Sequence, residues 1–340
     1  MIDIARAAGV SPMTVSRAFK NAGLVSPTAR AAVMQAADDL GYVFDSAASA
    51  LRSQRSDFVA VIIPSINNAN FADTVRGLSD GLRARGLQIL LGYTDYDVEA
   101  EEVLIAQLLR RRPEAMVVTG GTHTDRARVM LDKAAIPVIE MWDLPAHPIG
   151  HVVGFSNAAA MGTLVDHLAA IGRRRMAFIG GDAARDTRGT DRRRGFVAAV
   201  RRHGLDATRL IDAGPPPISM AEGAAAMADL LERMPDTDAV VCVSDLSAFG
   251  ALTECQRRGI AVPDQVAVAG FGDYEIAAVC VPPLTTVNPF PLRIGHEAAD
   301  LILKALDDEL PGPTILRVAP ELQARASSLG VGQDGRLIRR

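Results

Sequence analysis

The sequence predicts an α/β protein in which a small helical domain precedes a larger part built on parallel sheets. In residues 1–44 the apolar side chains recur at helical spacing in three short bursts. After residue 57, near-continuous apolar runs of strand length are mostly separated by amphipathic stretches of helix length. Such runs are typical of parallel strands that helices cover on both faces. The chain has 340 residues, which is enough for about two or three domains.

Three helices are expected in the first 44 residues. Ser11 precedes Pro12 and Ser26 precedes Pro27. Each pair places a capping hydroxyl at the N-cap and, at the first helical position, a proline, which has no N–H that would need a partner. Gly41 follows the third burst, where a residue that tolerates left-handed geometry ends a helix. The apolar positions that predict the buried faces are Ile4, Ala5 and Ala8, then Val15, Ala18 and Phe19, then Val33, Ala36, Ala37 and Leu40.

Nine apolar runs predict the strands of the larger part. In open parallel sheets, ligands bind beyond the carboxyl ends of the strands, so the residues directly after each run are candidate site residues. The runs are "FVAVIIP" (58–64), "LQILLG" (87–92), "AMVVTG" (115–120), "IPVIEM" (136–141), "HVVGFS" (151–156), "RMAFIGG" (175–181), "LIDAG" (210–214), "AVVCVSD" (239–245) and "VAVAGFG" (266–272).

Composition and charge narrow the class of protein. The chain is 49% hydrophobic with a net charge of −4, which indicates a globular protein without an overall basic coat. Residues 1–55 carry six Lys/Arg against four acids, so positive charge is concentrated at the front. The three cysteines have neither disulfide nor zinc spacing, and no run approaches the ~20 apolar residues of a membrane helix or resembles an export signal. We expect a cytoplasmic protein with no cofactor, no metal and no membrane partner.

The segment between the two parts, "DSAASALRSQ" (45–54), is rich in alanine and serine. Alanine favours a helix, but an isolated segment this short lies below the ~12 to 15 residues that give marginal helix stability in water. Two interpretations stay open at this point: a plain linker, or a helix that forms on contact with a partner.

The expected second helix, "SPMTVSRAF" after Gly9 and Val10, has the layout of a helix-turn-helix recognition helix. Arg17 can donate two hydrogen bonds to guanine, and short hydroxyl side chains can reach phosphates, while Pro12 and Met13 can touch thymine methyl groups. A lone arginine can equally be a solvated side chain on a helix. The predicted DNA-contacting residues of this helix are Ser11, Pro12, Met13, Thr14, Ser16 and Arg17.

Several separated motifs together resemble the lac-repressor family. "DIARAAGVSPMTVSRAF" is similar to its helix-turn-helix, "LGY" followed by "AASALR" to its hinge, "VPPLTTVNP" to its core, and "PELQARASS" to its closing strand. The resemblance runs from residue 2 to about residue 328. It implies a homodimer that binds a palindromic operator, and a type I periplasmic-binding-protein-like core of two doubly wound parallel-sheet subdomains around an effector cleft.

The resemblance also sets the expected domains. They are a helix-turn-helix domain at 1–44, a hinge at 45–56, an effector-binding core at 57–330 and a tail at 331–340. Within the core we expect an N-subdomain of about 57–155 and 287–315, and a C-subdomain of about 156–286 and 316–330.

By the same resemblance Ala48 and Leu51 enter the minor groove and Arg52 contacts DNA. Phe44 stands where relatives usually have proline, which predicts weaker operator binding than that of a Phe44→Pro variant. Relatives also carry a few residues before "IDIA", so the natural start is expected upstream of Met1.

Within that family the motifs "VGFSNAAA", "THTDRARVML" and "IPVIEMWD" resemble gluconate-operon repressors. Where sugar-binding relatives carry an aspartate, this chain has Gly272, which lessens repulsion of a carboxylate ligand. Arg192 matches the arginine that contacts the effector in the family, and Arg188 lies one helical turn before it. Two arginines can clamp a carboxylate through paired hydrogen bonds, although the stretch can also be a solvated helix start.

Five further residues at strand ends are expected in the effector cleft. The loop after the first strand contains Phe71, where the family places an aromatic ring over the ligand, although a core phenylalanine is the alternative. Asp245 can also serve as the N-cap of the following helix. Glu140 suits an anionic ligand only if it binds hydroxyl groups at the far end, and Ser244 stands where relatives commonly have asparagine. The five expected residues are Asn70, Phe71, His123, Glu140 and Asp245.

Enzymatic interpretations find little support in the sequence. "HEAAD" at 296–300 lacks the second histidine of a zinc-protease helix, and "GFGDYE" lacks the third glycine of a dinucleotide-binding loop. A solute-binding protein would have no use for residues 1–55. A regulator that responds to a neutral sugar, a sugar phosphate or a nucleobase stays open as the alternative to a sugar-acid repressor.

Overall fold

The computed structural model describes residues 1–20, 24–42, 56–181, 187–331 and 337–338. The chain divides into two compact units, Met1–Ser56 and Asp57–Arg340, here called the N-terminal unit and the core unit. The predicted hinge residues Phe44, Ala48, Leu51 and Arg52 lie outside the described residues.

The N-terminal unit contains the three expected helices, α1 (Ile2–Ala7), α2 (Pro12–Lys20) and α3 (Pro27–Asp39). Ser11 Oγ accepts a hydrogen bond from the Thr14 amide at 3.1 Å, and Ser26 Oγ accepts one from the Ala29 amide at 3.3 Å, as the Ser-Pro pairs predict. Gly41 has a φ of +59° directly after α3, as expected. The small core of this unit consists of Ile4, Ala5, Val15, Ala18, Val33, Ala36 and Ala37.

One expected core residue of this unit is wrong. Leu40 is 52% exposed because it caps α3 beyond the last full turn. The chain reverses at Gly41, and Tyr42 packs against the small core in its place.

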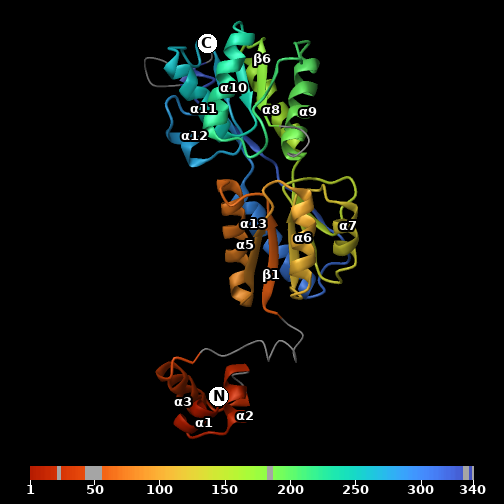
Figure 1. The fold of residues 1–340 in the computed structure, drawn as a ribbon, viewed down its shortest axis with the longest axis vertical. Helices are drawn as coiled ribbons and strands as arrows, with labels where there is room; N and C mark the ends of the chain where they lie inside the picture. The colour runs from red at the N-terminus through yellow and green to blue at the C-terminus, as the bar shows by residue number, and fades with distance from the viewer. Residues whose placement is uncertain (21–23, 43–55, 182–186, 332–336, 339–340) are drawn as a thin grey trace. The chain divides into compact units, whose positions relative to one another are not determined.

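The core unit has two lobes, each built on a parallel sheet (Figure 1). The first lobe holds six strands in the order β11-β5-β4-β3-β1-β2, with helices α5, α6, α7 and α13. Its strands are β1 (Phe58–Ile63), β2 (Gln88–Tyr93), β3 (Ala115–Thr119), β4 (Val138–Met141), β5 (His151–Gly154) and β11 (Ile315–Arg317), and its helices are α5 (Ala69–Leu82), the short 3₁₀ helix η2 (Arg83–Arg85), α6 (Val98–Leu109), α7 (Asp125–Asp132) and α13 (Pro291–Leu306).

The second lobe holds four strands in the order β7-β6-β8-β9, with helices α8 to α12. Its strands are β6 (Met176–Gly180), β7 (Leu210–Asp212), β8 (Ala239–Cys242) and β9 (Ala267–Ala269), and its helices are α8 (Asn157–Ala170), α9 (Thr187–Arg202), α10 (Met220–Arg233), α11 (Asp245–Arg257) and α12 (Glu275–Val279). All nine expected strands are present, and every pairing within the two sheets is parallel.

The chain crosses between the lobes three times. The crossings lie between β5 and α8, between β9 and α13, and after β11. The second and third crossings contain β10 (Thr286–Asn288) and β12 (Glu321–Gln323), which pair antiparallel with each other. The expected subdomain boundary at residue 315 falls at the start of β11, but Arg317 still pairs with Gly154 of β5, so the boundary lies later. Near the C-terminus, β13 (Gly330–Val331) pairs with β14 (Leu337–Ile338).

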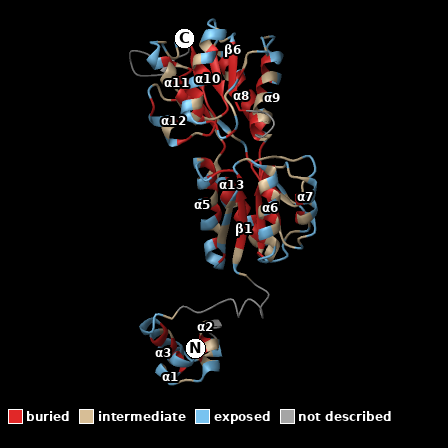
Figure 2. Ribbon diagram, in the orientation of Figure 1, coloured by how far each residue is buried: buried red, intermediate tan, exposed pale blue. Residues whose placement is uncertain are grey.

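Both sheets are buried between their helices (Figure 2). Strands β1, β3, β6 and β8 are buried along almost their whole length, as the continuous apolar runs predict. The edge strand β2 is different: it pairs with β1 on one side alone, and its Leu91 and Tyr93 are exposed. Among the described residues, no helix is long and apolar enough to cross a membrane.

Candidate functional site

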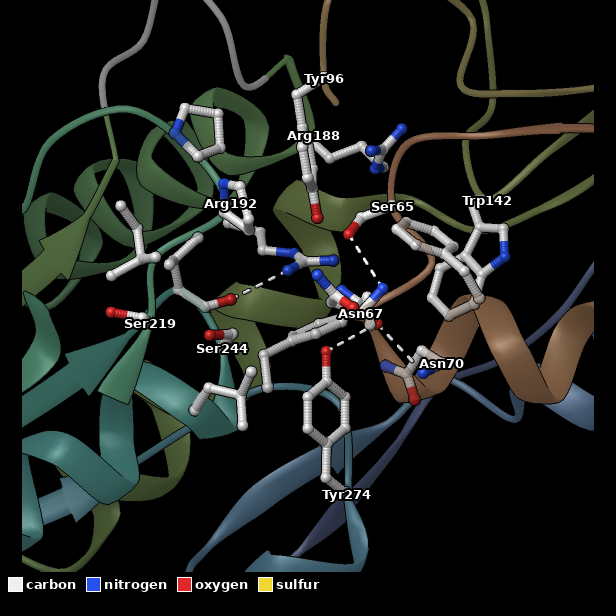
Figure 3. Close-up of a pocket in the computed structure, with 18 residues that line it drawn as sticks. Ser65, Asn67, Asn70, Tyr96, Trp142, Arg188, Arg192, Ser219, Ser244 and Tyr274 are labelled. Carbon is white, nitrogen blue, oxygen red and sulfur yellow. Dashed lines mark hydrogen bonds between the residues drawn. The ribbon is translucent and has the colours of Figure 1, made fainter. Parts of the chain in front are cut away.

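A cavity of about 240 Å³ lies where the carboxyl ends of the two sheets face each other. The first lobe contributes the loops after β1, β2 and β4 and the start of α5, and the second lobe contributes α9 and the loops after β7, β8 and β9 (Figure 3). The residues that line it are Ser65, Asn67, Asn68, Asn70, Phe71, Tyr96, Trp142, Arg188, Arg192, Pro216, Pro217, Ile218, Ser219, Val243, Ser244, Leu246, Phe271 and Tyr274. This is the crevice at which ligands bind in open α/β sheets.

Arg192 points from α9 into the cavity (Figure 3). Its Nε donates to Asn157 Oδ1 at 3.0 Å and its Nη1 donates to the Val243 carbonyl at 2.9 Å. Its Cζ lies 3.7 Å from the centre of the Phe271 ring, within the range of a cation–π interaction. These three contacts, with Asn157, Val243 and Phe271, therefore fix the guanidinium before any ligand is bound.

Arg188 reaches from the second lobe to the first. It is 6% exposed, and its Nη1 lies 3.4 Å from the Thr119 carbonyl at the end of β3. Its Cζ also lies 5.4 Å from the Phe71 ring centre and 5.8 Å from that of Tyr96. A buried cation that is surrounded by aromatic faces and a carbonyl favours a nearby anion.

The charge of the cavity wall is one-sided. Of the described residues that line it, two are arginines and none is a carboxylate. The polar remainder consists of the amides of Asn67, Asn68 and Asn70 and of hydroxyl groups such as that of Ser219. This combination can bind a small anion that also carries hydroxyl groups.

A hydrogen bond crosses the cavity between the lobes. The Tyr274 hydroxyl, from the second lobe, donates to Asn68 Oδ1, from the first, at 2.8 Å. Burial raises the pKa of Tyr274 above its usual range, so the hydroxyl keeps its proton. Gly272 has a φ of +133°, and a Cβ built there would lie 2.4 Å from the Tyr274 ring. The glycine therefore leaves room for the tyrosine on this wall of the cavity.

Four aromatic rings form a row along the cavity wall, and three of them, Phe71, Trp142 and Phe271, line the cavity itself. The centres of Phe71 and Trp142 lie 5.4 Å apart, those of Trp142 and Phe155 5.8 Å apart, and those of Phe155 and Phe271 6.1 Å apart. The row begins in the first lobe and ends beneath Arg192 in the second. These spacings are typical of edge-to-face and offset aromatic pairs, which give the wall a rigid backing.

Four of the residues expected in the effector cleft line the cavity: Asn70, Phe71, Arg188 and Arg192. His123, Glu140 and Asp245 are not among the lining residues, which corrects where their side chains were expected to point.

His123 and Glu140 face into the first lobe. His123 Nδ1 lies 2.7 Å from Glu101 Oε2, and its Nε2 lies 3.6 Å from Glu140 Oε1. Glu140 Oε2 accepts the Ile149 amide at 2.6 Å. Burial alone would lower the pKa of His123, but the hydrogen bond to Glu101 and the negative charges of Glu101 and Glu140 outweigh it and raise the pKa to about 9. The two carboxylates compensate the buried imidazolium inside the lobe, so removal of any one partner would leave an uncompensated buried charge.

Asp245 holds the second lobe's loops together. Its Oδ1 accepts from Thr286 Oγ1 at 2.6 Å, its Oδ2 accepts the Tyr274 amide at 2.8 Å, and Ser244, not Asp245, is the N-cap of α11. Burial raises the pKa of Asp245 to about 7, against the opposing effect of these two hydrogen bonds. Asp245 therefore fixes the loop that carries Tyr274, a lining residue, but does not line the cavity itself.

Sequence reasoning missed several residues of the cavity wall, among them Tyr96, Trp142 and Tyr274. Trp142 carried a signal, because it is the only tryptophan of the chain and directly follows a strand. Tyr274 lies two residues beyond the end of its apolar run (266–272), so it was not chosen when only the residues directly after each run were considered.

The expected DNA-contacting residues lie together on α2 and at its start. Val15 and Ala18 of this helix face the core of the N-terminal unit, whereas Met13 is 62% exposed and Ser11, Pro12 and Arg17 are also exposed. Thr14 and Ser16 are half-buried, and Ser11 Oγ lies 2.9 Å from Thr14 Oγ1. The helix thus buries one face in the core of the N-terminal unit and presents the expected DNA-contacting residues on the other.

Comparisons with known proteins match both units. Residues 1–45 match the family described as bacterial regulatory proteins, lacI family, and residues 165–328 match the periplasmic binding protein-like domain. The transcriptional regulator GntR of Pseudomonas aeruginosa is 37% identical over 326 residues, which cover 96% of this chain and 94% of that protein. GntR of Escherichia coli K12 is 32% identical, with 92% and 94% covered.

A solved structure of a lacI-family transcriptional regulator from Silicibacter pomeroyi is 35% identical, covers 96% of this chain and 98% of its own, and superimposes with a TM-score of 0.89. The resemblance seen in the sequence is thereby confirmed, and the alternative of a solute-binding protein without a DNA-binding unit is wrong. The chain belongs to the lacI family of bacterial regulatory proteins, which are DNA-binding transcriptional regulators and not enzymes.

Proposed function

We propose that the protein is a homodimeric repressor that binds a palindromic operator in the cytoplasm and is controlled by a sugar acid such as gluconate. The observation that carries the choice of effector is the pair of arginines, Arg188 and Arg192, in a cavity whose described lining residues include no carboxylate. Arginine binds carboxylates through two parallel hydrogen bonds, and the asparagines and serines of the wall suit the hydroxyl groups of an aldonate.

On the DNA side, the proposal assigns base contacts to Arg17 and thymine or phosphate contacts to Ser11, Pro12, Met13, Thr14 and Ser16. Two recognition helices of a dimer would read half-sites one helical turn or a multiple of it apart. Ala48, Leu51 and Arg52 are proposed to contact the minor groove at the operator centre.

Exposed apolar surface supports a dimer of the core unit. Val279 and Val281 are 68% and 75% exposed beside α11, whose Gln256 side chain bonds to the Val281 carbonyl. A groove between α10 and α11 is lined in part by Met220, Ala225 and Phe249. Apolar surface of this kind is typical of protein–protein contacts.

The proposed mechanism couples the cavity to the operator through the relative position of the lobes. An effector that binds one arrangement of the lobes more tightly shifts the population towards it and changes operator affinity. A coupling free energy of about 1 to 3 kcal/mol changes that affinity about 5- to 150-fold, and operator DNA must then change effector affinity by the same factor.

The test is thermal unfolding of the purified protein with aldonates, neutral sugars, sugar phosphates and purines. A ligand at 100 times its Kd adds about 2.7 kcal/mol to the unfolding free energy. We expect gluconate or a close aldonate to raise the Tm, and Arg192→Ala to remove the rise. Stabilisation by a neutral sugar, a phosphate ester or a purine instead would overturn the sugar-acid assignment in favour of the alternative effector.

A further inference from the structure

Asn157 connects the two walls of the cavity without lining it. It is the first residue of α8, at the first crossing between the lobes, and it is 1% exposed. Its Nδ2 donates to the Trp142 carbonyl at 3.1 Å, and its Oδ1 accepts from Arg192 Nε at 3.0 Å. One buried amide therefore joins Trp142, a wall residue of the first lobe, to Arg192, a cationic wall residue of the second.

The two partners require an amide at this position. The Trp142 carbonyl can only accept a hydrogen bond, and Arg192 Nε can only donate one. An aspartate would place a second acceptor against the Trp142 carbonyl, and its charge would compete for the guanidinium. An alanine would leave two buried polar groups without this partner, which costs about 1–3 kcal/mol for each neutral group.

Trp142 is held in a conformation that needs support. Its φ is +73°, in the left-handed region that a bulky side chain rarely adopts. Its Nε1 donates to Thr74 Oγ1 at 3.2 Å, and the Phe71 ring packs edge-on against it. The bond from Asn157 anchors the backbone of this residue, and the contacts with Thr74 and Phe71 anchor its side chain.

We propose that Asn157 is a positioning residue that aims the Arg192 guanidinium at an anionic effector and links that contact to Trp142 in the first lobe. The identity of the anion rests on the proposed function, whereas the alignment of Arg192 and Trp142 does not. Because Arg192 and Trp142 belong to different lobes, a ligand that engages the guanidinium acts through Asn157 on the wall of the first lobe.

The chain carries its own reporter for this link, since Trp142 is its only tryptophan. The experiment compares full-length wild type, Asn157→Ala and Asn157→Asp. Asn288→Ala serves as the control, because it removes a half-buried asparagine at another crossing, where it bonds to Asp273 and the Phe290 amide. The first readout, without ligand, is the emission maximum and acrylamide quenching of Trp142. The second is the Kd of gluconate and of sorbitol, a polyol of the same length without the carboxylate.

We expect Asn157→Ala to shift the Trp142 emission and increase its quenching, while Asn288→Ala leaves both as in wild type. Gluconate affinity falls at least about tenfold in Asn157→Ala, as for loss of a charge-assisted hydrogen bond, and further in Asn157→Asp. The affinity of Asn157→Ala for sorbitol stays within about threefold of the wild-type value. The variant therefore loses the preference for the acid over the polyol.

A merely structural role predicts a different pattern. Asn157→Ala would then lower the Tm as Asn288→Ala does, with unchanged Trp142 emission and an unchanged ratio of gluconate to sorbitol affinity; this result overturns the proposal. If wild type binds no aldonate, the proposed function fails, and the Trp142 fluorescence of the ligand-free variants still decides whether Asn157 positions the wall.

Discussion

The guanidinium of Arg192 lies over the ring of Phe271, with Cζ 3.7 Å from the ring centre. The two residues come from different segments, α9, which follows β6, and the loop after β9; β8 separates these two strands in the sheet, and both residues line the cavity. The guanidinium is intrinsically planar, and the contact with the ring helps to fix the orientation of the plane in which its N–H groups can meet a carboxylate.

Replacing Arg192 by lysine and by alanine separates charge from geometry. Lysine keeps the positive charge but loses the stacking and the paired donors, so we expect gluconate affinity to fall about 10- to 100-fold in Arg192→Lys and further in Arg192→Ala. Calorimetric titration measures both. Equal gluconate affinity of wild type and Arg192→Lys would show that binding does not need the planar, paired donors of the guanidinium.

Tyr274→Phe removes the hydrogen bond between the lobes, which spans 2.8 Å to Asn68. Loss of one neutral hydrogen bond is worth about 0.5–1.5 kcal/mol, so we expect gluconate to bind about 2- to 10-fold more weakly with little change in overall fold. Tyr93→Phe is the matched control, since Tyr93 is 57% exposed on the edge strand. An affinity equal to that of Tyr93→Phe would show that the bond does not assist binding.

Gly272 tests the effect of an acid at this position. Gly272→Ala places a Cβ 2.4 Å from the Tyr274 ring at a φ of +133°, so we expect a lower Tm and weaker gluconate binding. Gly272→Asp adds a negative charge to the same distortion. The difference in gluconate affinity between the two variants measures charge repulsion alone, and we expect about a tenfold or greater loss for aspartate. No difference between them would show that charge at residue 272 has no influence.

The His123 cluster gives the first lobe a pH-dependent stability. The pKa of His123 is about 9 in the folded protein and about 6.5 when unfolded, so its stabilisation is complete below pH 6.5 and is lost as the pH rises through 9. We expect the unfolding free energy to fall by roughly 1–3 kcal/mol over that interval. His123→Gln should remove most of this dependence, while His147→Gln, at an exposed position, retains it. Urea titrations at several pH values decide between these outcomes.

On the N-terminal unit, Arg17→Ala and Arg30→Ala remove the same charge from different helices. Both arginines are exposed, but only Arg17 lies on the proposed recognition helix. For an operator selected in vitro from random duplexes, we expect a loss of about 1–3 kcal/mol for Arg17→Ala with relaxed preference at one base pair. Arg30→Ala should weaken specific and non-specific binding alike. Identical effects of the two substitutions would refute a base contact by Arg17.

The sequence predicted the sheets better than the cavity wall. Continuous apolar runs identify buried parallel strands because burial on both faces leaves little choice of residue, and Phe71 and Arg192 follow from strand ends and from the family resemblance. The direction of a side chain after a strand depends on the loop's backbone. His123 follows β3 yet faces Glu101, and Trp142 enters the wall through a left-handed φ that no composition pattern reveals. Asn157 was not predicted at all, because its role depends on two partners that are distant in sequence.

The pairing of β10 with β12 limits how the core unit can deform. Two of the three crossings form one antiparallel ribbon, in which Thr286 pairs with Gln323 and Asn288 with Glu321. A two-stranded ribbon twists and bends at low cost, but it cannot lengthen without breaking its ladder. The lobes can therefore swing or turn about this ribbon, and they cannot be pulled straight apart. We therefore expect a ligand in the cavity to change the angle between the lobes more readily than their separation.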